Sequence, residues 1–126
     1  MTPAEVVRLW ISRFNDADVE GLVELYAPDA INDQVVFDEP MKGREAIGRM
    51  FEIEFGRAEM VCLEQRLHEA GSWAILEWKD PAGLRGCGFF HVQNDKIVEQ
   101  RGYFDQLTFF KSQGLGIPDS YLESAD

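Results

Sequence analysis

Apolar residues in the first part of the chain recur at helical spacing. A helix is predicted to begin after Thr2, because Thr2 and Glu5 stand in capping-box positions and the proline between them suits a first helical turn. Its apolar positions lie three and four residues apart and form one stripe: Val6, Val7, Trp10, Ile11 and Phe14. Asp18 then caps a second, short helix that extends through Tyr26, and Pro28 ends it.

A polar strand and a third helix follow. Residues 30–37 are predicted as a strand, although Asn32, Asp33 and Gln34 make it unusually polar. The helix, about 44–55, presents one apolar side made of Ile47, Met50, Phe51 and Phe55. A purely structural core does not favour polar residues, so the polar strand is a candidate for a binding surface.

From residue 61 onward apolar and polar residues alternate, as in half-buried strands. Four long strands joined by turns, one of them the hairpin signal Asn94-Asp95, are predicted: 61–68, 73–78, 84–93 and 97–107. A short helix is expected near 109–113, and the tail from residue 114 is expected to be loosely held. Helices followed by hairpin-linked strands indicate one antiparallel α+β domain over 1–126, with its core at about 5–113.

Composition narrows the class of partner. A chain of 126 residues has little room for a second core, and a hydrophobic content of 45% suits a packed interior. The 12 basic and 23 acidic residues give a net charge of −11, which repels phosphate backbones and anionic lipid. Nucleic acid and membrane are therefore not expected partners, whereas a neutral or cationic ligand fits. The N-terminus has no signal-peptide pattern and no apolar run approaches the ~20 residues of a membrane span, so a cytoplasmic location is expected.

Cysteines and histidines give no sign of a metal or cofactor site. Cys62 and Cys87 have no CxxC spacing and are interpreted as buried thiols in a reducing compartment, with a disulfide or a reactive thiol as the alternative. His68 is expected at a strand end and His91 on the outer sheet face, without a patterned set of carboxylates. The glycines at 86–88 precede no helix, so they do not form a phosphate loop. No metal and no cofactor are expected.

Several segments, in this order, resemble the nuclear transport factor 2-like superfamily. They are LxxLYAPDA at 22–30, GREAI at 43–47, GCGFFHV at 86–92, and KIVE at 96–99 running into YFD at 103–105. This group includes SnoaL-like domain proteins, ketosteroid isomerases, limonene-epoxide hydrolases and polyketide cyclases. The resemblance implies a cone-shaped α+β fold, in which a strongly curved antiparallel sheet wraps on three N-terminal helices and encloses an apolar pocket for a small molecule. It also implies a homodimer formed through the outer sheet face.

The resemblance does not extend to the catalytic set of the isomerases. Their oxyanion-binding tyrosine corresponds to Trp10 and their later-strand acid to Gly88, so chemistry of that design is not expected. The position of their first-strand base falls at Gln34, or at Asp38 or Glu39 when counted from the other side of the loop. Alternatively, Asp38 and Glu39 form a solvated turn.

The epoxide hydrolases and cyclases use an aspartate on the final strand, and its position carries Gly102 here. The middle-strand arginine and aspartate of the hydrolases fall near Glu77 and Lys79. Strand alternation places Asp105 on the face opposite Gly102, so it is expected to face a partner subunit or solvent.

A different polar lining is therefore expected in the pocket. Strand parity places these polar residues inward: Asn32, Gln34, Glu77 and Gln100. Gly102 keeps the pocket open, and aromatic residues are expected around it: Trp10, Phe14, Trp73, Phe90 and Phe104. In such surroundings the pKa of Glu77 would be raised, as a general acid or base requires. The alternative is an ion pair of Glu77 with Lys79 or an arginine at the sheet rim.

Two functions are compatible with this pattern. One is a cofactor-independent acid–base enzyme of the hydrolase, isomerase or cyclase type, in which Glu77 moves a proton on a small, mostly apolar substrate. The other is a non-catalytic ligand-binding or dimerisation module. A buried, unpaired Glu77 beside a pocket of a few hundred Å3 would favour the enzyme, whereas a filled interior, or Glu77 in a surface ion pair, would argue against it.

Overall fold

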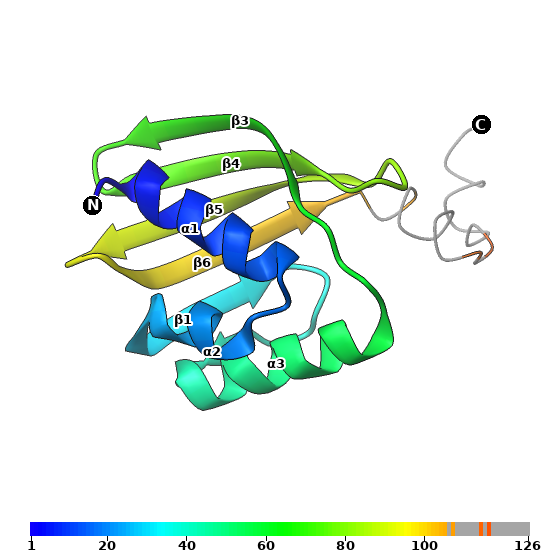
Figure 1. Ribbon diagram of the computed structural model, residues 1–126, viewed down its shortest axis with the longest axis horizontal. Helices are drawn as coiled ribbons and strands as arrows, with labels where there is room; N and C mark the ends of the chain where they lie inside the picture. The colour runs from blue at the N-terminus through cyan, green and yellow to red at the C-terminus, as the bar shows by residue number, and fades with distance from the viewer. Residues whose placement is uncertain (106, 108–113, 115, 117–126) are drawn as a thin grey trace.

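In the computed structural model, helices cover one side of an open sheet (Figure 1). The structure describes residues 1–105, 107, 114 and 116, so the helix expected at 109–113 lies outside the described residues. Within the described part of the chain the helices are α1 (Pro3–Asn15), α2 (Val19–Glu24) and α3 (Gly43–Arg57). The strands are β1 (Tyr26–Gln34), β2 (Met41–Lys42), β3 (Leu63–Ala70), β4 (Trp73–Lys79), β5 (Arg85–Gln93) and β6 (Lys96–Phe104). The expected α+β class is confirmed.

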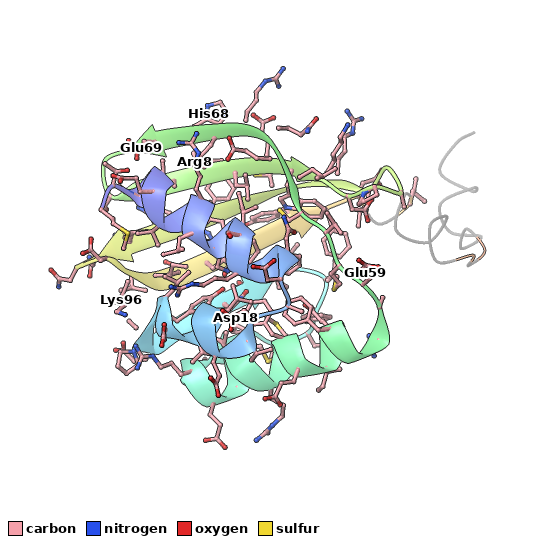
Figure 2. All side chains as sticks on the ribbon, in the orientation of Figure 1. Arg8, Asp18, Glu59, His68, Glu69 and Lys96 are labelled. Carbon is pink, nitrogen blue, oxygen red and sulfur yellow. The ribbon has the colours of Figure 1, made fainter. Side chains whose placement is uncertain are left out.

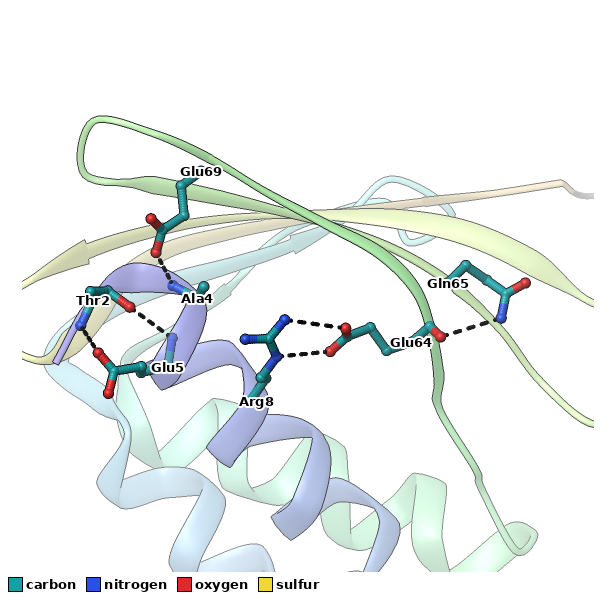
Figure 3. A network of polar contacts seen from close by, with 7 residues as sticks. All are labelled: Thr2, Ala4, Glu5, Arg8, Glu64, Gln65 and Glu69. Carbon is teal, nitrogen blue, oxygen red and sulfur yellow. Dashed lines mark hydrogen bonds and ion pairs between the residues drawn. The ribbon is translucent and has the colours of Figure 1, made fainter.

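The start of α1 is fixed by the capping box that the sequence predicts. The Glu5 amide donates to Thr2 Oγ1 at 3.2 Å, and the Thr2 amide donates to Glu5 Oε1 at 3.0 Å (Figure 3). The same helix is tied to β3, because Glu69 accepts from the Ala4 amide at 2.8 Å and Arg8 pairs with Glu64 at 3.3 Å. These contacts hold α1 across the sheet, where its apolar stripe is buried.

Asp18, labelled in Figure 2, lies at the start of α2. It caps this helix, as predicted, by accepting a hydrogen bond from the Gly21 amide at 3.0 Å. The helix is shorter than expected and ends at Glu24. Tyr26 belongs instead to β1, which begins earlier than the predicted strand. The tertiary reason is that Tyr26 pairs with Ile97 of β6, whose amide also donates to the Leu25 carbonyl at 2.7 Å.

The strand order is β2-β1-β6-β5-β4-β3. The strands β3 to β6 form antiparallel neighbours, and the hairpin at Asn94-Asp95 has positive φ at both residues, 52° and 63°, as a tight hairpin turn requires. β1 pairs with β6 in parallel, so the expectation of a wholly antiparallel sheet was wrong on this pair. A hairpin enforces antiparallel pairing, but β1 and β6 are joined through most of the chain and are free of that constraint.

The two faces of the sheet have different roles. The inner face packs on the helices through residues such as Ala74, Leu76 and Phe90, which belong to the buried core. The alternating residues of β4 and β5, Trp73 and His91 among them, lie on the outer face. This division decides which side chains can reach the interior.

Candidate functional site

In the part of the chain that the structure describes, the buried polar side chains are those of Asn32 and Gln100. Asn32 is 1% exposed and Gln100 is 5% exposed, and the parallel pairing of β1 with β6 places them opposite each other. Asn32 Nδ2 donates to Gln100 Oε1 at 3.2 Å. The inward orientation predicted for both residues is thus what the structure shows.

Tyr26 is the centre of this polar network. Its hydroxyl accepts from Trp10 Nε1 at 3.0 Å and from Asn32 Nδ2 at 3.5 Å, and it donates to Gln100 Oε1. Burial raises the pKa of the Tyr26 phenol, so it remains protonated at neutral pH. Gln100 uses only its oxygen in these bonds, and no described residue accepts a hydrogen bond from its Nε2 amide.

Gln34 extends the network toward the end of β1. Its Nε2 donates to Asn32 Oδ1 at 2.7 Å. Gly102 lies opposite Gln34 on β6, and a Cβ atom there would come within 2.6 Å of the Gln34 Cδ. The Gln34 amide therefore fits beside β6 because Gly102 has no side chain.

Aromatic rings surround the network, as predicted for Trp10, Phe14 and Phe90. Trp10 stacks on Phe14 with ring centroids 4.9 Å apart and meets Phe90 edge-on at 5.4 Å. Phe51 of α3 joins them from the helical side, 6.3 Å from Phe14. Phe104 is half-buried and continues the inward register of β6. The network thus lies in largely apolar surroundings.

α3 contributes a further polar side chain that was not among the predicted site residues. Glu54 follows Ile47 by seven residues and Phe51 by three, so it occupies a position of the buried helical stripe. It is half-buried, and its carboxylate has no hydrogen bond or ion pair with any described residue. Burial raises the pKa of Glu54, while the charge of Arg57 acts in the opposite direction. In the sequence, Glu54 could have been identified as a candidate site residue because it is a glutamate within the apolar stripe of this helix.

Glu77 and Trp73 do not point inward, and this expectation was wrong. The Glu77 side chain is 40% exposed on the outer face, where His68 Nε2 donates to it at 2.7 Å and Arg66 lies 3.5 Å away. The hydrogen bond from His68 lowers the pKa of Glu77, and the charge of Arg66 acts in the same direction. The physical argument for a poised acid or base at Glu77 therefore fails.

The outer face carries its own aromatic and charged group. Trp73 stacks on His91 with centroids 4.5 Å apart, and the Arg101 guanidinium lies 5.2 Å from the Trp73 ring and 5.5 Å from the Phe89 ring. Phe89 meets Tyr103 edge-on at 5.9 Å. The outward position predicted for His91 is confirmed.

A hollow of about 570 Å3 is lined by residues of β3, β4, β5 and β6, and it shares Tyr103 with this group. Its lining mixes charged, polar and aromatic residues: Gln65, Arg66, Glu77, Trp78, Arg85, Gly86, Cys87, Tyr103, Phe104 and Asp105. Asp105 is thus part of an outward-opening surface rather than of the network. Asp38 and Glu39 are exposed in the loop between β1 and β2, in line with the solvated-turn alternative.

Both cysteines are free thiols. Burial raises the pKa of Cys62 to about 12, and burial likewise raises the pKa of Cys87, so neither is an activated nucleophile. Among the described residues no cluster of three or more metal-binding side chains occurs. No helix in the described part of the chain is long and apolar enough to cross a membrane.

Comparison with known proteins agrees with this architecture. The family model for the SnoaL-like domain matches residues 7–100. No curated protein sequence gives a significant match.

Solved structures of the same fold are numerous, and three of them illustrate how little sequence they share with this chain. A protein with a ketosteroid isomerase-like fold from Catenulispora acidiphila, in complex with trimethylamine, has a TM-score of 0.81 at 17% identity, over 92% of this chain and 96% of its own. IdmH from Streptomyces antibioticus, a candidate polyketide cyclase, has a TM-score of 0.78 at 20% identity, over 91% and 100%. An LEH-like epoxide hydrolase from M. tuberculosis has a TM-score of 0.75 at 19% identity, over 87% of each chain. At these identities the similarity shows the fold alone.

Proposed function

The chain belongs to the SnoaL-like domain family, and we propose that its interior binds a small, mostly apolar molecule that carries one hydrogen-bond acceptor. The observation that carries this proposal is the buried polar network of Tyr26, Asn32 and Gln100 in an aromatic core. Burying such groups is unfavourable unless they are hydrogen-bonded, and a core needs none of them for packing. A binding role explains their presence.

The network orients a ligand rather than moving protons. It consists of amides, an indole and a phenol, and burial raises the pKa of the Tyr26 phenol further. Such groups do not exchange protons at neutral pH, but they do donate hydrogen bonds. The Nε2 amide of Gln100 is the donor that we assign to a carbonyl or hydroxyl oxygen of the ligand. Cofactor-independent acid–base chemistry stays a prediction from the sequence, without Glu77 as its acid.

Amide NMR tests this proposal directly, because each side chain of the network has its own N–H signal. Uniformly 15N-labelled protein is titrated with cyclohexanone, and methylcyclohexane is the matched probe without an acceptor. We expect cyclohexanone to shift the Gln100 amide and Trp10 indole signals more than methylcyclohexane does, and to leave the Trp73 indole of the outer face unchanged. Shifts confined to Trp73, or no shifts up to the solubility limit, would refute interior binding. Native mass spectrometry of the purified protein then searches for the natural ligand.

We further propose that the outer sheet face joins two copies of the chain. Support comes from the large apolar side chains on this face, Trp73, Ile75 and Phe89, together with Tyr103, which is 42% exposed. Light scattering after size exclusion should give a dimer mass for the wild type and a monomer mass for Ile75→Asp. Ile53→Asp is the matched control, since Ile53 is exposed on α3. A wild-type monomer at high micromolar concentration would refute this interface. The cytoplasmic location also stays a prediction.

A further inference from the structure

Glu54 is a charged side chain in a position that the fold otherwise fills with apolar groups. It stands on the stripe of α3 that carries Ile47, Met50 and Phe51 into the core. A leucine at this position would continue the apolar stripe. A half-buried carboxylate loses part of its hydration, which is unfavourable. The helix does not need Glu54 for packing.

Its charge lacks a protein partner. No hydrogen bond or ion pair joins the Glu54 carboxylate to any residue that the structure describes. Arg57, on the next turn of α3, acts on it only at longer range. The other half-buried carboxylate with an altered pKa, Glu77, is held by His68 and Arg66. Glu77 therefore has charged partners, whereas Glu54 has none among the described residues.

Aromatic residues flank Glu54 on α3. Phe51 precedes it by one helical turn and stacks on Phe55 with centroids 5.8 Å apart, and Phe55 meets Phe14 at 5.2 Å. Its negative charge also acts on the phenol of Tyr26, the centre of the polar network, whose pKa it raises. Phe51 also lies 6.3 Å from the Tyr26 ring, so Glu54 is one helical turn from a residue that contacts the network. The faces of aromatic rings attract organic cations.

We propose that Glu54 makes this site selective for a small organic cation, an alkylammonium, whose charge lies beside Glu54 and whose polar group reaches the buried network. This inference rests on the proposed interior site and specifies the class of its ligand. An alkylammonium supplies the counter-charge that the carboxylate lacks and a weakly hydrated surface for the rings. The net charge of −11 attracts cations over longer distances.

The test uses choline and 3,3-dimethylbutan-1-ol, which have the same shape and hydroxyl group but differ by one positive charge. Both are titrated into 15N-labelled wild type, and dissociation constants are taken from the Trp10 indole and Gln100 amide signals. We expect choline to bind about tenfold more tightly than its neutral isostere, since one desolvated cation contact has that magnitude. Choline is a permanent cation, so its own protonation cannot vary.

Two variants separate the role of Glu54 from general electrostatics. Glu54→Gln should abolish the preference for choline and leave the affinity for the neutral isostere within about twofold, because only one charge has changed. Glu52→Gln is the matched control, since Glu52 is exposed on the same helix and its loss changes net charge equally. Circular dichroism checks that both variants fold.

The outcomes distinguish the two proposals. If the alcohol and cyclohexanone bind at the network but choline binds no better, the cation inference is wrong and the interior site stands. An equal loss of preference in Glu52→Gln and Glu54→Gln also overturns it, because the field of the whole protein then explains the effect. If none of the three probes shifts the network signals, the interior site itself is refuted and the cation inference fails with it.

Discussion

Removing the hydroxyl of Tyr26 is the most direct perturbation of the buried network. Tyr26→Phe deletes one oxygen that takes part in hydrogen bonds with Trp10, Asn32 and Gln100. Asn32 Nδ2 and Gln100 Oε1 still bond to each other at 3.2 Å, but the buried Trp10 Nε1–H loses its only acceptor among the described residues. An orphaned buried donor costs about 1–3 kcal/mol, so we expect the free energy of unfolding to fall by about 2 kcal/mol.

Urea unfolding followed by circular dichroism measures this difference. The matched control is Tyr103→Phe, which removes the same atom from a tyrosine that is 42% exposed on the outer face of the single chain. All proteins are unfolded at a concentration at which light scattering gives a monomer mass, because this face is the proposed interface between two copies. The control should stay within about 0.5 kcal/mol of the wild type. On heating, Tyr26→Phe should melt roughly 8 °C below the wild type, given about 4 °C per kcal/mol for a domain of this size. If the two variants unfold at the same urea concentration, the network does not hold the interior together and the reasoning fails.

Three other predictions concern packing and charge. Gly86→Ala should lower the free energy of unfolding by about 2–3 kcal/mol, because the new Cβ meets a backbone oxygen and an indole ring. Gly102→Ala should lower it by only about 1 kcal/mol, since only a flexible side-chain amide must move. Urea unfolding of both variants checks this order. The His68 hydrogen bond lowers the pKa of Glu77, so this pKa should rise toward its ordinary value in His68→Ala, as measured by a 13C carboxyl titration. Because the Glu77 pKa is lowered in the folded state, ionised Glu77 stabilises the fold above the ordinary glutamate pKa. This stabilisation is lost as pH falls through the folded-state pKa. Burial raises the pKa of Glu54, so the free energy of unfolding decreases as pH rises through that pKa. Glu54→Leu should therefore unfold at a higher urea concentration than the wild type at pH 7 and lose this advantage at pH 4. An advantage that does not depend on pH would contradict a raised pKa.

Local features of the fold could be predicted because their causes are local. The capping box at Thr2 and the turn at Asn94-Asp95 depend on residues a few positions apart, and both occur as expected. The inward positions of Asn32 and Gln100 followed from alternation along two strands whose other inward residues are mostly apolar or small. These predictions needed no knowledge of distant contacts.

The orientation of β4 shows what alternation leaves undetermined. It correctly groups Trp73 with Glu77 and separates both from Ala74 and Leu76. Both groups contain apolar residues, so the pattern cannot say which one the helices cover. Strand parity alone left both assignments open, and the inward assignment of Glu77 was wrong because α1 packs on the face that carries Ala74 and Leu76.

The amino-acid sequence by itself determined the order of the helices and of the long strands, because the spacing of apolar residues and the caps act over a few residues. Only the tertiary structure decided that β1 runs parallel to β6 and that Tyr26 bonds to both Trp10 and Gln100. It also decided that Glu54 is half-buried without a hydrogen bond or ion pair to any described residue. Each of these depends on segments far apart in the chain. Their meeting is set by the burial of all apolar surfaces at once, and no local pattern contains that information.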